Sequence, residues 1–248
     1  MSAKTTVLAL HGFSQNAAVF SKRLGALRKQ CGKTVEFVFL DAPMVLQPVD
    51  LVGSASASLD AGDAVESRAW FRWNEDKSEA VGLPQSIRVL RDVLKERRFD
   101  GVLGFSQGAG MAAFLSALLE RPNAYPDFLI DGQPPHPPFK FCVAVSGFRL
   151  RGSIGESIFS ENYRTPTLHV IGKTDIIVVE ERSRALVAVS DNARVEEHDG
   201  GHFVPSKGNW RKFLAAYLAD PAGDVPSPSA SAESSGTSTP GEGLTPRL

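Results

Sequence analysis

The chain has 248 residues, and its 27 basic and 28 acidic side chains are interspersed and give a formal net charge of -1. This balance provides no basic stripe for nucleic acid and no polycationic face for membrane lipid, so we expect a neutral small molecule as the partner. The two cysteines, Cys31 and Cys142, are too few for a disulfide framework, and no stretch approaches the ~18 apolar residues of a membrane span.

The length favours a single domain of ordinary or somewhat large size. The first apolar run, 7–10, is too short for the core of a signal peptide. Cys142 lies within an apolar run that predicts a central strand, and we interpret both cysteines as reduced thiols. We therefore expect a soluble protein in the cytoplasm, with the nucleus as an additional location. The sequence leaves the oligomeric state open.

Residues 7–40 predict a strand, a helix and a second strand. The continuous apolar run 7–10 is typical of a parallel strand that is buried on both faces. Asn16 can cap a helix that reaches about Lys29, because its side chain can accept a hydrogen bond from the first helical turn. The next strand follows at 35–40, and the three elements together form a βαβ unit.

Two segments lack any clear periodicity. The first, 44–82, contains the aromatic residues Trp70, Phe71 and Trp73, and the second, 121–139, is rich in proline and predicts an extended surface loop. Long loops without structure of their own are uncommon unless they are functional. We therefore expect both segments to lie near the mouth of a pocket.

The rest of the domain alternates amphipathic helices with short apolar strands. In chain order we expect a helix from Pro84, a strand at 102–105, a helix that ends at Glu120, strands at 141–146 and 167–171, a helix at 180–189, a strand at 193–197 and a helix around Trp210. Such alternation implies an α/β fold of three αβα layers, in which helices cover both faces of a mostly parallel sheet. The ligand site of such a fold lies at the carboxyl ends of the strands.

The C-terminal residues 221–248 differ in composition from everything before them. They are mostly Pro, Ser, Gly and Thr, with almost no bulky apolar side chain. Such a segment cannot recover the entropy lost on ordering, so we predict a disordered tail after a folded domain at 1–220.

Ser106 is the predicted nucleophile. It is the centre of Gly104-Phe105-Ser106-Gln107-Gly108, between an apolar strand and a helix of small residues. A sharp turn from strand to helix forces its central residue into a strained conformation and leaves the hydroxyl exposed, and flanking glycines make room for the turn. The alternative is a serine that only caps the following helix. The pentapeptide alone is moderately specific, so the interpretation also depends on later elements.

Asp175 and His202 follow the ends of two later strands, and the chain order Ser, Asp, His is that of an α/β-hydrolase. His202 would take the proton from Ser106 and return it to the leaving group, while Asp175 holds the imidazole in the correct tautomer. Asp199, only three residues before His202, is the alternative acid. Two glycines between His198 and His202 argue against a helical metal-binding pair, so we expect no metal and no cofactor.

The backbone N–H groups of Phe13 and Gln107 are the predicted oxyanion hole. Gln107 opens the helix after the nucleophile, so the positive end of the helix dipole lies behind its N–H group. Phe13 follows a His-Gly pair at the end of the first strand. Five aromatic residues are candidates for an acyl pocket, with the hydrophobic core as the alternative: Trp70, Phe71, Trp73, Phe148 and Phe203.

Five segments carry a resemblance to a known family: Leu8-Ala9-Leu10-His11-Gly12-Phe13, the run 99–109 around Ser106, Val145-Ser146-Gly147-Phe148, Gly172-Lys173-Thr174-Asp175 and Gly200-Gly201-His202-Phe203-Val204-Pro205. Together they resemble the FSH family of serine hydrolases, which includes the ovarian-cancer-associated esterase of animals. The resemblance covers about Thr5 to Leu218. It implies an α/β-hydrolase that acts on carboxylic esters or thioesters, with Ser106, Asp175 and His202 as its triad.

The main hypothesis is therefore a serine hydrolase that cleaves esters of small or acyl-chain substrates through an acyl-enzyme. One alternative is a protein that keeps the hydrolase fold, binds a ligand and does not turn it over. Another is a thioesterase that releases acyl or polyketide acids, which rests on fold-level analogy alone.

Overall fold

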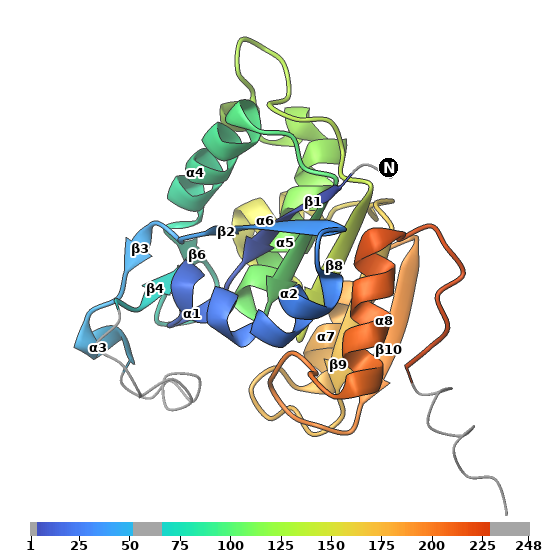
Figure 1. Ribbon diagram of the computed structural model, residues 1–248. Coiled ribbons are helices and arrows are strands. Elements are labelled where there is room, and N and C mark those ends of the chain that lie inside the picture. The colour runs from blue at the N-terminus through green and yellow to red at the C-terminus, as the bar shows by residue number, and fades with distance from the viewer. Residues whose placement is uncertain (1–3, 52–65, 229–248) are drawn as a thin grey trace, which may run out of the picture.

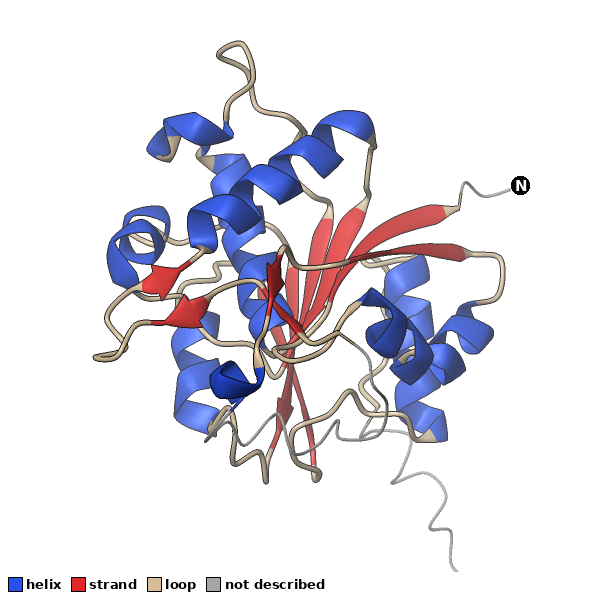
Figure 2. Cartoon of the chain, turned by 90° about the vertical axis from the view of Figure 1, so that its left-hand side faces the viewer, coloured by secondary structure: helices blue, strands red, loops and turns tan. Residues whose placement is uncertain are grey.

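The structure is a computed structural model that describes residues 4–51 and 66–228. Its centre is a six-stranded sheet in the order β10-β9-β8-β7-β1-β2, in which all neighbouring strands are parallel. The strands are β1 (Thr5–Leu10), β2 (Val35–Leu40), β7 (Gly101–Phe105), β8 (Phe141–Val145), β9 (Thr167–Gly172) and β10 (Ala193–His198). Figure 2 shows this sheet between two groups of helices. The predicted three-layer α/β fold is confirmed.

Two hydrophobic cores hold the layers together, one on each face of the sheet. Alternate residues of β1 belong to different cores, because successive side chains of a strand point to opposite faces. One face is covered by α1 (Ala17–Arg23), α2 (Gly25–Cys31) and α8 (Gly208–Ala219), of which α2 and α8 pack against each other (Figure 1). The other face is covered by α4 (Leu83–Glu96), α5 (Gln107–Glu120), α6 (Gly152–Ile158) and α7 (Glu180–Val187).

The central strands and the central helix are the most deeply buried elements. All five residues of β7 and all five of β8 are buried, as expected for apolar runs in the middle of a parallel sheet. In α5, every residue from Gln107 to Leu119 is buried, because small side chains let the helix pack closely against the sheet and its neighbours. This packing fixes the start of α5, where the nucleophile is predicted.

Two helical predictions need correction. The single helix expected from Asn16 to Lys29 is two helices, α1 and α2, which meet at Leu24 and Gly25. Asn16 does cap α1, since its side chain accepts a hydrogen bond of 2.9 Å from Val19 N. The break lies at a glycine, a residue with low helix propensity. The helix α6 was not predicted, because its seven residues include two glycines and two serines.

The segment 44–82 contains short elements of its own. Strand β3 (Met44–Val45) pairs with β4 (Arg68–Ala69), and β5 (Arg72–Trp73) pairs with β6 (Ala80–Val81), in both cases antiparallel. Helix α3 (Pro48–Leu51) follows β3, and residues 52–65 lie outside the described residues. Two-residue strands produce no periodicity in the sequence, so the pattern alone could not reveal them.

The prediction that 121–139 lies near the pocket mouth is wrong. This segment joins the end of α5 to the start of β8, so it lies at the end of the sheet where the strands begin. It contains the 3₁₀ helices η2 (Pro122–Ala124) and η3 (Pro126–Phe128), and buries Phe128 and Phe139 in the core. We call this end of the sheet the amino edge and the opposite end the carboxyl edge.

The first residues of the predicted disordered tail are packed on the domain. Val225 O accepts a hydrogen bond of 2.7 Å from Arg194, and Pro228 O accepts one of 3.0 Å from Asn209. Val225 also packs on the core between α8 and the sheet. The prediction of disorder is therefore wrong for 221–228, and residues 229–248 lie outside the described residues.

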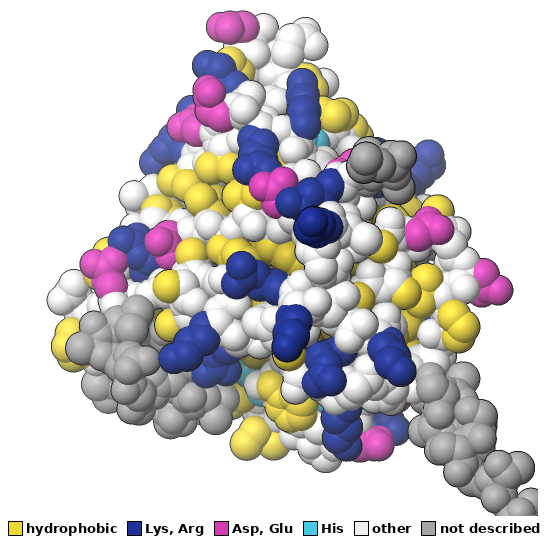
Figure 3. All heavy atoms as spheres, viewed as in Figure 1, with side chains coloured by type: hydrophobic (Ala, Val, Ile, Leu, Met, Phe, Trp, Pro, Cys, Tyr) yellow, Lys and Arg dark blue, Asp and Glu magenta, His cyan; other side chains and the backbone are white. Residues whose placement is uncertain are grey.

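Charged side chains segregate more in space than along the chain. Figure 3 shows Lys and Arg side chains across the middle of the face seen in Figure 1, with Asp and Glu toward its margins.

Within 4–51 and 66–228, no helix has the length and apolar character needed to cross a lipid bilayer.

Candidate active site

Ser106 lies at the carboxyl edge, in the sharp turn between β7 and α5. Its backbone has a φ of 54° and a ψ of -117°, a conformation that residues with a Cβ rarely adopt. Neighbouring glycines are required there, because a Cβ on Gly104 would lie 2.1 Å from the carbonyl oxygen of Gly108. A Cβ on Gly108 would in turn lie 2.2 Å from the carbonyl oxygen of Leu10 in β1. Close packing of α5 against the sheet thus forces the strain, which costs about 1–3 kcal/mol.

His202 and Asp175 reach Ser106 from the ends of β10 and β9. His202 Nε2 lies 2.9 Å from Ser106 Oγ, and His202 Nδ1 lies 2.7 Å from Asp175 Oδ2. Because an ionised carboxylate can only accept, Nδ1 carries the proton and Nε2 is left to accept the serine hydroxyl. The three side chains come together as the sequence predicts, although Ser106 and His202 are separated by 96 positions along the chain.

The local structure keeps Asp175 ionised. Burial alone would raise its pKa, but hydrogen bonds from His202 and from the backbone N–H groups of Val178 and Ile177 outweigh burial and hold the pKa below its usual value. The side chains of His202 and Asp175 are only 5% and 1% exposed. A buried anion next to the imidazole stabilises its protonated form, which general base catalysis requires.

Asp199 takes no part in this arrangement. Its side chain is 91% exposed and pairs with Lys173 Nζ at 2.8 Å. His198 lies elsewhere too, with its ring 5.0 Å from Phe203 and 5.7 Å from Trp210. Both ring nitrogens of His202 are occupied by Ser106 and Asp175, so His198 and His202 do not share a ligand site.

Of the two predicted oxyanion donors, Gln107 follows Ser106 in the chain, and Phe13 lies in the loop after β1, the strand that pairs with β7. Within the described residues, neither the N–H of Phe13 nor that of Gln107 has a recorded acceptor. The loop that carries Phe13 is held by a hydrogen bond of 3.1 Å from Gly12 N to Gln15 Oε1. N–H groups that are free to donate at this edge of the sheet are suited to bind the negative oxygen of a tetrahedral intermediate.

The side chain of Gln107 has a role that the sequence did not reveal. Its Oε1 accepts from Trp70 N at 2.8 Å, and its Nε2 donates to Phe71 O at 2.8 Å. Trp70 also donates its indole N–H to His11 O at 2.9 Å. The segment between β4 and β5 is thereby bonded to both predicted oxyanion loops. A buried polar residue directly after the nucleophile was the signal that could have indicated this role.

His11 is a structural residue of the same network. Its Nδ1 donates to Gly12 O at 2.7 Å, and its Nε2 accepts from Ala42 N at 3.0 Å. Burial lowers the pKa of His11 to about 4, against a smaller opposite effect of the Gly12 hydrogen bond. His11 is therefore neutral near pH 7 and links the ends of β1 and β2.

The five predicted pocket aromatics have three different locations. Trp70 and Phe71 are completely buried, so their assignment to the pocket wall is replaced by the role just described. Trp73 and Phe148 line a cavity of about 430 Å³ at the carboxyl edge. Phe203 is 45% exposed and lies next to His202 in the chain, at the rim of the site.

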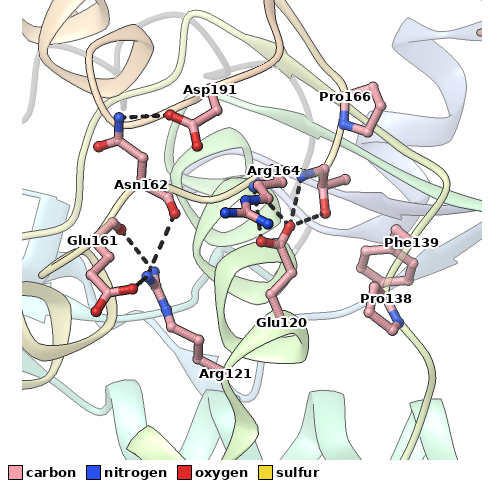
Figure 4. A pocket seen from close by; sticks show the side chains of 10 residues that line it. Glu120, Arg121, Pro138, Phe139, Glu161, Asn162, Arg164, Pro166 and Asp191 are labelled. Atoms are coloured by element: carbon pink, nitrogen blue, oxygen red, sulfur yellow. Dashed lines mark hydrogen bonds and ion pairs between the residues drawn. The ribbon is translucent and has the colours of Figure 1, made fainter.

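A larger cavity, of about 770 Å³, lies at the amino edge between the end of α5 and the starts of β8 and β9 (Figure 4). Backbone N–H groups, a hydroxyl and one ion pair satisfy several of its charged groups. Glu120 accepts hydrogen bonds from the backbone of Arg164 and from both N and Oγ1 of Thr165, and Arg121 donates to Glu161. None of the predicted catalytic residues lines it. Size alone therefore does not identify the active site.

A parallel sheet with a strained serine after β7, hydrogen-bonded to a histidine and through it to an aspartate, defines an α/β-hydrolase. The crystal structure of Zea mays acyl-protein thioesterase 2 has the same fold, with a TM-score of 0.58 and 23% identity over 88% of this chain and 95% of that one.

Sequence comparison gives the family. Residues 1–214 match the serine hydrolase (FSH1) family, so the chain belongs to this family. Esterase OVCA2 of Danio rerio is 34% identical over 227 residues, which cover 86% of this chain and 95% of the relative. Esterase CG5412 of Drosophila melanogaster is 33% identical over 227 residues, which cover 88% of this chain and 74% of the relative. The resemblance noted in the sequence is confirmed.

Proposed function

We propose that this serine hydrolase is an esterase in which Ser106 attacks the carbonyl carbon of a carboxylic ester. His202 Nε2 accepts the hydroxyl proton as the new bond forms, and Asp175 stabilises the resulting imidazolium. The N–H groups of Phe13 and Gln107 stabilise the tetrahedral oxyanion, each by about 3 kcal/mol in the transition state. The single observation that carries the proposal is the 2.9 Å contact between His202 Nε2 and the oxygen of a conformationally strained serine.

The second half of the reaction uses the same groups. The imidazolium gives its proton to the departing alcohol, and an acyl-enzyme on Ser106 remains. A water molecule then loses a proton to His202 and attacks the acyl carbon, which releases the acid and restores the serine. Thioesters can follow the same course with a thiol as the leaving group, and the names of the curated relatives favour the oxygen esters.

Covalent labelling with a fluorophosphonate probe tests the nucleophile. We expect the wild type to be labelled and Ser106→Ala to be unlabelled. Ser146→Ala is the matched control, since Ser146 is also buried, also has a positive φ, of 50°, and follows the neighbouring strand β8. Labelling that survives in Ser106→Ala and is lost in Ser146→Ala would refute the assignment.

Turnover distinguishes an esterase from a protein that only binds its ligand. We expect the wild type to hydrolyse p-nitrophenyl acetate and Ser106→Ala to release nitrophenol only at the background rate. A folded wild type that gains thermal stability from esters but releases no product would instead support the ligand-binding alternative. A matched oxoester and thioester of the same acid then measure the preferred leaving group.

A further inference from the structure

The cavity lined by Trp73 and Phe148, which we call the cationic cavity, contains an excess of positive charge. Of its eight lining residues, four are basic and one is acidic: Trp73, Lys77, Phe148, Arg149, Arg151, Glu156, Arg182 and Ala185. The whole chain has a net charge of only -1. The tertiary structure thus brings together four basic side chains from three distant segments of the chain. The even distribution of charge along the sequence offered no reason to expect this cluster.

The cationic cavity lies at the same edge of the sheet as the predicted catalytic serine, since Phe148 follows the end of β8 and Ser106 follows the end of β7. The Phe71 ring packs against both of its aromatic walls, at 5.2 Å from Trp73 and 6.5 Å from Phe148, measured between ring centres. Phe71 O also accepts the hydrogen bond from Gln107, the residue after Ser106. Phe71 therefore connects the aromatic walls of this cavity to the first residue of α5.

The positive charge is largely uncompensated. Arg149 pairs with Glu156, at 2.5 Å. Within 4–51 and 66–228, no carboxylate lies at ion-pair distance from Lys77, Arg151 or Arg182. Arg182 instead lies 4.4 Å from the centre of the Phe148 ring, and burial together with the charge of Arg151 lowers its pKa, against a smaller opposite effect of the charge of Asp175. Cations held near one another without counterions are electrostatically unfavourable unless an anion joins them.

The walls of the cationic cavity are fixed in place. Lys77 lies in the tight turn between β5 and β6, with a φ of 58°. Glu79 of the same turn accepts hydrogen bonds from Ser153 N at 3.0 Å and from Ser153 Oγ at 3.1 Å, at the start of α6. This contact holds the β5–β6 hairpin against the loop that carries Arg149 and Arg151. A preformed wall lowers the entropic cost of binding a ligand.

We propose that the cationic cavity binds an anionic group, a carboxylate or a phosphate, that is carried by the ester or thioester on which Ser106 acts. Trp73 and Phe148 contact the apolar part of the substrate, and Lys77, Arg151 and Arg182 contact its anionic end. The proposal rests on the esterase activity and names the class of substrate. A carboxylate would belong to the acyl part and a phosphate to the leaving group, and the two sources can be separated by experiment.

Two matched substrate pairs measure the preference. The carboxylate pair is p-nitrophenyl hemiglutarate and p-nitrophenyl valerate, which have similar length and differ in one charge. The phosphate pair is butyryl-coenzyme A and butyryl-N-acetylcysteamine. We expect the anionic member of one pair to have a kcat/KM at least about tenfold higher, mainly through KM, because charge-assisted hydrogen bonds are strong. This ratio should fall as salt is added.

Substitutions test whether the cavity causes the preference. Arg151→Gln, Lys77→Gln and Arg182→Gln should each lower the ratio of anionic to neutral kcat/KM by about threefold to tenfold. Arg184→Gln is the matched control, because Arg184 lies on the same helix as Arg182 but pairs with Glu180 and Glu197 outside the cavity. A wild-type ratio near one for both pairs, or a ratio that none of the three substitutions changes, would overturn the proposal.

Binding to the inactive variant separates this inference from the proposed function. Ser106→Ala should bind glutarate or coenzyme A in calorimetry, and the added substitution Arg151→Gln should weaken that binding. If no ester is hydrolysed but this binding is observed, the esterase assignment fails and the anion site stands. If esters are hydrolysed, but neither glutarate nor coenzyme A binds and neither anionic substrate is preferred, the proposed anion site is wrong and the esterase assignment stands.

Discussion

The two edges of the sheet differ in how their polar groups are satisfied. At the amino edge, the larger of the two cavities described contains the Arg121–Glu161 ion pair, and Glu120 receives hydrogen bonds from two consecutive residues (Figure 4). At the carboxyl edge Ser106 is strained, and within residues 4–51 and 66–228 the N–H groups of Phe13 and Gln107 have no hydrogen-bond acceptor, and no carboxylate lies at ion-pair distance from Lys77, Arg151 or Arg182. The comparison shows that cavity volume by itself does not mark the edge where chemistry is expected.

The largest effect that follows from this comparison is on Asp175. Asp175→Asn should lower kcat/KM for p-nitrophenyl acetate by about 10⁴-fold, because an amide in this position no longer fixes the imidazole tautomer. Asp199→Asn, three residues before His202, should leave the rate unchanged, since Asp199 is exposed and pairs with Lys173. Equal losses in both variants would show that the acid has been assigned wrongly.

Acid should destabilise the fold through buried neutral histidines. Burial lowers the pKa of His11 and of His169 from 6.5 to about 4, so the unfolded chain binds more protons between these values. Each histidine thus contributes stability that is complete above about pH 6.5 and is lost as the pH falls toward 4, by about 3 kcal/mol.

Denaturant unfolding at pH 7 and at pH 4.5 measures this loss. His169→Leu serves as the comparison, because within the part of the chain that the structure describes the buried Nε2 of His169 has no hydrogen-bond partner, so its removal breaks no bond of that atom. We expect a shallower dependence of stability on pH in this variant. If the stability of this variant depends on pH as strongly as that of the wild type, burial does not lower the pKa of His169 in the folded protein.

Glu120 tests the amino edge. Glu120→Gln should lower the free energy of unfolding by about 2 kcal/mol, because the amide loses the charge that strengthens the hydrogen bonds from Arg164 and Thr165. The kcat/KM for esters should not change. A loss of activity without a loss of stability would place function at this edge and reverse the comparison.

The smallest effect concerns the strain at Ser106. Ser106→Gly should raise the free energy of unfolding by about 1 kcal/mol while it abolishes activity, since glycine adopts a positive φ without strain but is more flexible when unfolded. Ser206→Gly, at an exposed position without a positive φ, should be slightly destabilising. A destabilised Ser106→Gly would contradict the strain argument.

Several errors of the sequence analysis have physical causes. Trp70 and Phe71 were candidates for a pocket with the hydrophobic core as the alternative, and the sequence could not separate the two because a buried core and a pocket wall favour the same aromatic residues. The segment 121–139 was placed at the wrong edge, although a connection that enters β8 must lie where that strand begins. The short strands of 44–82 and the glycine-containing α6 produce no periodic pattern, so their structure depends on tertiary contacts.

The sequence by itself determined the parallel sheet, the helices on both faces, and the order of Ser106, Asp175 and His202 along the chain. It could do so because continuous apolar runs and glycines around a turn are local signals. Only the tertiary structure decided that Gln107 is bonded to the β4–β5 segment and that Lys77, Arg151 and Arg182 lie around one cavity. These groups are far apart in the chain, and their proximity is fixed by the packing of loops at the carboxyl edge.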